Sequence, residues 1–191
     1  IWEVLSIGTT SPRRQAAYNA LKRIPALTPV GIAPLPQARL EASVAHAGAM
    51  KDERIRALRA GADLFRRHPE IVEELGGGLR RALKAARRIP DLGRASTLRL
   101  LLFSSGTPVL ALDEHAFRVA QRLGYGKDHE KAVRALRSTR RAVVAESGRE
   151  LETLRMLTQY FTHNGLATCT QVAPHCAVCP LARDCECLRR Q

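Results

Sequence analysis

The sequence has no apolar run long enough to cross a lipid bilayer. The longest run, Leu98 to Phe103, is interrupted by Arg99, whereas a spanning helix needs about 18 or more apolar residues. The chain opens at Ile1 without a charged and then apolar leader of the kind that directs secretion. We therefore expect a cytoplasmic protein with no membrane span.

Acidic residues are scarce. The 191 residues include 18 Asp and Glu against 31 Lys and Arg, which gives a formal net charge of +13. The 45% of apolar residues is ordinary for a globular protein, so intrinsic disorder is not expected, and the length allows one sizeable core or two small ones. Excess positive charge favours nucleic acid as a partner, because Lys and Arg release counterions from phosphates. A solvated basic surface would have the same composition, so charge alone does not decide.

Strand-like alternation of polar and apolar residues is also missing, and the apolar spacing is helical almost throughout. We therefore predict an all-α protein. Ser11 is the expected N-cap of an early helix, and Leu79, Ala82, Leu83 and Ala86 are expected on one helix face. Tyr160 and Phe161 are expected to pack in a core. The predicted helices include 2–5, a segment after Ser11, 36–46, 51–67, a short segment before 76–78, 79–86, 96–103, 114–123 and 151–163.

Cysteine is absent from the first 168 residues, and all five cysteines lie in the last 23. The first four have the spacing C-x6-C-x2-C-x5-C. An odd, clustered set indicates a metal site rather than a disulfide framework. Thiolates suit zinc and iron–sulfur clusters alike, and ligand chemistry leaves both open. The four candidate ligands are Cys169, Cys176, Cys179 and Cys185, with Cys187 and His175 as possible alternatives.

Two further segments could carry function. The segment Ile89 to Gly93 predicts a tight turn between two helices, where backbone N–H groups could hold a DNA phosphate, although any two packed helices need such a turn. Asp113 follows the apolar segment Pro108 to Leu112 and precedes a predicted helix. An aspartate at this place is expected to begin that helix as its N-cap.

Taken together, these motifs resemble the helix-hairpin-helix DNA glycosylases, most closely the endonuclease III branch. The family hairpin L-P-G-V-G-R-K is matched by Ile89 to Ala95, and V-D-T-H-x-F-R-V is matched by Leu112 to Val119. The iron–sulfur loop of the family has the spacing of Cys169 to Cys185. All three motifs occur in family order and at family distances, so the resemblance covers nearly the whole chain.

The resemblance implies an architecture and a cofactor. It implies a six-helix domain over 1–107 with the hairpin near 81–103, an iron–sulfur domain over 108–191 with the cluster loop at 169–185, and a DNA-binding cleft between them. It implies a 4Fe–4S cluster rather than zinc, with Cys187 outside the ligand set. It also implies a monomer that associates with the nucleoid and binds double-stranded DNA containing damaged or mismatched bases. The DNA-binding positions carried over are Ile89, Pro90, Asp91, Leu92, Gly93, Arg94 and His115.

The resemblance implies base-excision repair in which a flipped base is removed by cleavage of its N-glycosidic bond. Ala95 stands where the bifunctional enzymes of the family have a lysine that forms a Schiff base with the sugar. Alanine cannot do this, so AP-lyase activity should be weak or absent. Asp113 would then assist water in a monofunctional reaction, as in the adenine glycosylase branch.

Three departures from the family concern lesion recognition and phosphate contact. Gly8 occupies the position of a glutamine that fills the gap left by the flipped base, and Met50 is the only apolar wedge expected in a second intercalating loop. Asp91 replaces the first hairpin glycine and brings a carboxylate toward phosphate. With Ala95, these changes motivate an alternative, a catalytically silent or structure-specific DNA-binding paralogue. A zinc module without repair function is a third hypothesis.

Basic residues are also expected near the hairpin, namely Lys84, Arg87, Arg88, Arg94 and Arg99. For His115, a packed or capping role is the alternative to DNA contact.

Overall fold

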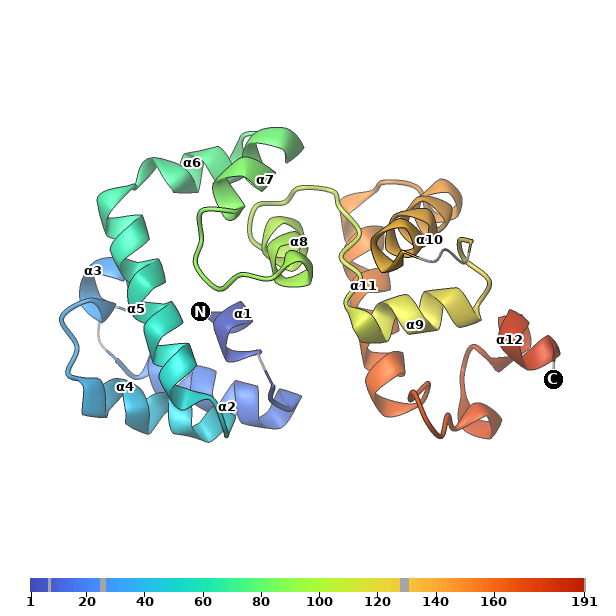
Figure 1. Cartoon of the computed structure of the whole chain (residues 1–191), viewed down its shortest axis with the longest axis horizontal. Helices are drawn as coiled ribbons and strands as arrows, with labels where there is room; N and C mark the ends of the chain where they lie inside the picture. Colours follow the sequence, from blue (N-terminus) through green and yellow to red (C-terminus); the bar gives the residue numbers. More distant parts are fainter. Residues whose placement is uncertain (7, 25–26, 128–130, 191) are drawn as a thin grey trace. The chain divides into compact units, whose positions relative to one another are not determined.

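The computed structural model describes residues 1–6, 8–24, 27–127 and 131–190, and every regular element within these ranges is helical. This confirms the predicted all-α fold class. The chain divides into two compact units, Ile1–Thr97 and Leu98–Gln191, and the division falls inside helix α8 (Arg94–Phe103) (Figure 1). The functional domain boundary expected after residue 107 stays a prediction. No helix in the described ranges is long and apolar enough to cross a membrane.

The first unit consists of short helices around one apolar core. Fully buried side chains such as Leu5, Leu21, Leu40 and Val44 meet there, with Ile55 almost fully buried beside them. The predicted helix over 51–67 is confirmed as α5, the longest helix of this unit. The elements are α1 (Trp2–Leu5), α2 (Ser11–Lys22), α3 (Pro29–Ile32), α4 (Gln37–Val44), the 3-10 helix η1 (Ala45–Ala47), α5 (Lys51–Arg67), α6 (Glu70–Gly76), α7 (Leu79–Ala86) and the first residues of α8.

One local prediction for this unit was wrong. The N-cap of α2 is Thr10, and Ser11 is the first helical residue, which moves Pro12 one position into the helix. In α7, the buried face consists of Ala82, Ala85 and Ala86, whereas Leu79 is 45% exposed. Leu79 is the first residue of α7, where the helix has no preceding turn to cover it. Small alanines then form the buried face of the first hairpin helix.

The second unit contains the rest of α8 and the helices that follow it. The sequence did not predict α10, because its buried positions are Ala135, Thr139 and Val143, which make a weak apolar stripe. Helix α11 was predicted to end at His163 and continues to Ala167; within it Phe161 is buried as expected, but Tyr160 is 67% exposed. The elements after α8 are α9 (Glu114–Arg122), α10 (Ala132–Ser147), α11 (Leu151–Ala167), the 3-10 helices η2 (Cys176–Val178) and η3 (Ala182–Asp184), and α12 (Glu186–Arg189).

Helices α9 and α11 lie side by side and form the main packing contact of the second unit (Figure 1). Gly165 of α11 permits this approach, since a Cβ atom built there would lie 2.6 Å from the carbonyl oxygen of His115 in α9. Real Cβ atoms do not approach backbone this closely. The glycine therefore sets the distance between the helix that Asp113 begins and the helix that leads to the cysteine loop.

Candidate functional site

The segment before α9 holds Asp113 in a defined position. Leu110, Ala111 and Leu112 are buried, and two of their backbone groups are hydrogen-bonded to the surrounding helices. The Ala111 N–H donates to Oγ1 of Thr158 in α11 at 3.3 Å, and Nε of Arg140 in α10 donates to the Leu110 carbonyl at 2.8 Å. Helices α10 and α11 therefore fix the backbone that leads to Asp113.

Asp113 is the N-cap of α9. Its backbone is extended, with φ of −81° and ψ of −176°, and its Oδ1 accepts a hydrogen bond from the Ala116 N–H at 2.8 Å. This contact satisfies one of the amide groups that a helix start leaves without a partner. The capping role that the sequence left open for Asp113 is therefore present in the structure.

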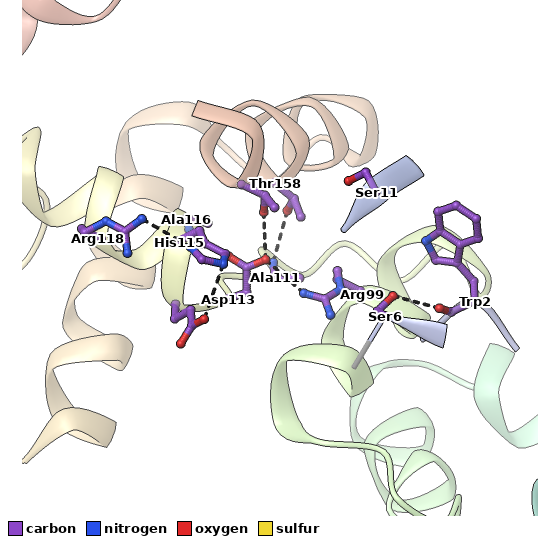
Figure 2. Close-up of polar contacts among 12 residues, drawn as sticks. Trp2, Ser6, Ser11, Arg99, Ala111, Asp113, His115, Ala116, Arg118 and Thr158 are labelled. Atoms are coloured by element: carbon purple, nitrogen blue, oxygen red, sulfur yellow. Dashed lines mark hydrogen bonds and ion pairs between the residues drawn. The ribbon is translucent and has the colours of Figure 1, made fainter. Parts of the chain in front are cut away.

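The second carboxylate oxygen of Asp113 has two partners from other helices. Nη1 of Arg99 in α8 donates to Oδ2 at 3.2 Å, and Oγ1 of Thr162 in α11 donates to the same atom at 3.1 Å. The side chains of Arg99 and Asp113 are 20% and 15% exposed, so the ion pair is mostly shielded from solvent. Figure 2 shows the Arg99 guanidinium pointing toward this carboxylate. Sequence reasoning placed Arg99 near the hairpin and did not identify Thr162, because no local motif connects either residue with Asp113.

His115 lies between two charged side chains on the first turns of α9. Its Nε2 lies 3.4 Å from Glu114 Oε1. Its Nδ1 lies 3.3 Å from Nη2 of Arg118 (Figure 2). Arg118 also donates to the backbone carbonyls of Gly165 and Cys169, at 2.7 and 2.9 Å. The His115 side chain thus belongs to a polar network that joins α9 to the end of α11. Its predicted contact with DNA stays a prediction.

All five cysteines line one pocket near the end of the chain. Arg122 of α9 reaches this pocket and donates from Nη1 to Sγ of Cys169 at 3.2 Å and to the Thr170 carbonyl at 2.8 Å. Sγ of Cys185 lies 3.4 Å from the Arg122 carbonyl. In the part of the chain that the structure describes, no three His, Cys, Asp or Glu side chains lie close enough together to hold a single metal ion. The predicted ligands thus share one pocket without converging on one point.

The predicted hairpin turn lies between α7 and α8. Asp91 has a φ of +55°, a left-handed conformation that few residues other than glycine, asparagine and aspartate adopt readily. Asp91, Gly93 and Arg94 are exposed, and the Thr97 N–H donates to the Gly93 carbonyl at 2.8 Å as α8 begins. Asp91 thus has a backbone conformation that glycine would adopt without strain. Contacts between this turn and DNA stay a prediction.

The basic residues expected around the hairpin have different environments. Lys84, Arg87 and Arg94 are exposed. Arg88 donates to Glu74 at 3.2 Å and to Glu70 at 3.3 Å, both in α6. With Arg99 paired to Asp113, two of the five candidates are already engaged with carboxylates.

The two positions that the sequence linked to base flipping lie close together. A Cβ atom at Gly8 would be 3.4 Å from Sδ of Met50, and both residues have positive φ angles, of 57° and 64°. Both are exposed. The buried Arg54 supports the Met50 loop by donating to the carbonyls of Gly48 and Ala49. Gly8 and Met50 thus form one exposed surface in the first unit.

Known proteins similar to this chain agree with the motifs. No family model matches the chain. A curated relative, endonuclease III of Bacillus subtilis (strain 168), is 28% identical over 116 residues, which are 61% of this chain and 50% of that protein. An endonuclease III in a non-covalent complex with DNA has a TM-score of 0.74 at 19% identity, covering 99% of this chain and 82% of the other. A thermostable thymine-DNA glycosylase has a TM-score of 0.73 at 17% identity, covering 100% and 82%.

These comparisons confirm the resemblance that the motifs indicated. The chain has the all-α fold of the helix-hairpin-helix DNA glycosylases. More narrowly, it is similar to endonuclease III in both sequence and fold. The aligned part of the chain spans about half the length of the curated relatives that it matches.

Proposed function

We propose that this protein is a DNA N-glycosylase of base-excision repair that acts on double-stranded DNA as a monomer. The observation that carries the proposal is Asp113, a carboxylate held by three helices at the start of α9, in a chain with the endonuclease III fold. An enzyme that acts on a base of duplex DNA has to flip the target nucleotide out of the base stack. The proposed substrate is a damaged or mismatched base in duplex DNA, and the proposed location is the nucleoid of the cytoplasm.

In this reaction, water attacks the anomeric carbon of the deoxyribose while the N-glycosidic bond breaks. The bonding electron pair leaves with the base, the water proton passes to the Asp113 carboxylate, and an abasic site remains. The negative charge of Asp113 also stabilises the positive charge that develops on the sugar. Both roles need one carboxylate and no amine.

AP-lyase activity is proposed to be weak or absent, because Ala95 has no amine that could form a Schiff base with the opened sugar. The test uses end-labelled duplexes containing thymine glycol, uracil, an A:G mismatch or an abasic site. We expect strand breaks at one of the base lesions only after hot alkali. Breaks without alkali would contradict a monofunctional enzyme. No breaks on any duplex, with DNA binding retained, would favour the silent DNA-binding paralogue.

Ala95→Lys supplies the missing amine at the half-buried first turn of α8. We expect this variant to form a covalent protein–DNA adduct that borohydride traps, because a lysine at this position can attack the sugar. The unchanged protein should form none, and Ala95→Met, of similar length without an amine, is the matched control. Trapping by the unchanged protein at the level of the lysine variant would overturn the proposed role of Ala95.

We further propose that Cys169, Cys176, Cys179 and Cys185 hold a 4Fe–4S cluster. Support comes from the five thiols that line one pocket, from the softness of thiolate ligands, and from the hydrogen bond that Arg122 donates to Cys169. The cluster would link η2, η3 and the end of α11, and thus stabilise the loop between them. Hydrogen bonds from Arg118 and Arg122 to backbone carbonyls join this loop to α9, whether it holds a cluster or zinc.

The ligand set can be tested with two single substitutions. Cys176→Ser is expected to lose the broad visible absorbance of a 4Fe–4S cluster, because it removes one of the four thiolates. Cys187→Ser, which changes a thiol in the same pocket, is expected to retain it. The measurement is the visible spectrum together with iron content per chain. Equal loss in both variants would show that Cys187 is a ligand, and a colourless unchanged protein that contains zinc would favour the zinc module.

A further inference from the structure

The ion pair between Arg99 and Asp113 is unexpected beside a carboxylate that has to act on a cationic transition state. The guanidinium donates to Oδ2 at 3.2 Å, and both side chains are mostly buried. Thr162 donates to the same oxygen at 3.1 Å. The Ala116 N–H donates to Oδ1 at 2.8 Å (Figure 2). A carboxylate has about four acceptor positions on its two oxygens, and at least three of them are therefore in use.

A fixed positive charge at this place has a definite electrostatic consequence. It lowers the negative potential that Asp113 presents to a sugar on which positive charge develops, and it occupies the oxygen that would accept the proton of water. Thr162 uses the same oxygen but carries no charge. The effect of Arg99 on chemistry is therefore separable from a simple hydrogen-bonding role.

The position of Arg99 in α8 adds a second observation. It follows Ala95 by four residues in a continuous helix, so the two positions share a helix face. Ala95 marks where the resembling enzymes have a cationic lysine. In this chain position 95 has no amine. Arg99 places a positive charge one helical turn later, and its guanidinium donates to Asp113.

We propose that Arg99 is a positioning residue that holds and neutralises Asp113, so that base excision proceeds only when the guanidinium leaves Oδ2. This inference rests on the proposed glycosylase function. While it is paired with Asp113, the Arg99 side chain slows the chemical step and does not contact the substrate. Removing it is expected to increase the rate of base release from bound DNA and to leave the affinity for DNA unchanged.

The test compares single-turnover base release at saturating protein with DNA affinity measured by fluorescence anisotropy. Arg99→Met removes the charge and keeps an unbranched side chain, and Arg99→Gln is a second neutral variant should the first fail to fold. We expect both to release base about tenfold faster than the unchanged protein, a fraction of what a general base contributes. Arg99→Lys keeps a positive charge and should gain less. Arg137→Gln, on the exposed face of α10, is the control for loss of one positive charge in the same unit.

A double substitution separates electrostatics from packing. In an Asp113→Asn background, Arg99→Met should produce no increase, because the carboxylate that Arg99 neutralises is missing. The inference is supported if the neutral variants release base faster when Asp113 is present and not when it is asparagine. It is also supported if the unchanged protein is silent and Arg99→Met is active. If the unchanged protein is active and the neutral variants are equal or slower, the inference is wrong and the proposed function stands. If no variant releases any base, the proposed function and the inference fall together.

Discussion

Asp113→Asn is expected to slow base release by at least about 10²-fold, the lower end of what a general base contributes, while DNA affinity changes little. Asparagine keeps an oxygen that can accept the Ala116 N–H, so the N-cap of α9 survives. It loses the negative charge that would assist water and stabilise the sugar cation. The measurement is single-turnover base release from the duplex on which the unchanged protein acts, with fluorescence anisotropy for DNA binding.

Two controls define what this result would mean. Asp113→Ala should lose the rate and also the cap, which costs about 1 kcal/mol in the free energy of unfolding. Asp63→Asn removes a carboxylate from α5 that pairs with Arg66 and Arg67 on the surface, and it should leave base release unchanged. Base release by Asp113→Asn at the rate of the unchanged protein would reduce Asp113 to a structural cap.

Gly165→Ala is expected to destabilise the second unit strongly, although it adds only one methyl group. The new Cβ would lie 2.6 Å from the carbonyl oxygen and 2.8 Å from the carbonyl carbon of His115, so α9 and α11 must move apart. Overpacking of this kind costs about 1–3 kcal/mol in the free energy of unfolding. The separation would also disturb the Arg118 hydrogen bond to the Gly165 carbonyl and, through it, the cysteine loop.

Gly61→Ala provides the matched control, because Gly61 also lies inside a long helix but has no atom within 4 Å of a built Cβ. There the same substitution should raise stability by up to about 1 kcal/mol, since alanine has the higher helix propensity. Denaturant unfolding followed by circular dichroism measures both. Equal effects of the two substitutions would show that the approach of α9 and α11 does not depend on Gly165.

Local signals account for the elements that were predicted well. Apolar residues at helical spacing predicted α5 from residue 51 to residue 67, and the turn before α8 was placed by Pro90 and Gly93. The missed helix α10 shows the limit of this reasoning. Its buried positions are an alanine, a threonine and a valine. The hydroxyl of Thr139 can be buried because it donates to the carbonyl of Tyr125, which lies before the helix. Such a partner is not visible in a local pattern.

The candidate site divides in the same way. The sequence by itself determined that Asp113 begins a helix and that four cysteines lie within one short loop, because caps and ligand spacing involve residues close together in the chain. It also determined that position 95 has no amine. Only the tertiary structure decided that Arg99 and Thr162, which are 14 and 49 residues from Asp113, share its second oxygen. That meeting depends on how α8, α9 and α11 pack, and a side-chain contact between separate helices leaves no period or motif in the sequence of either.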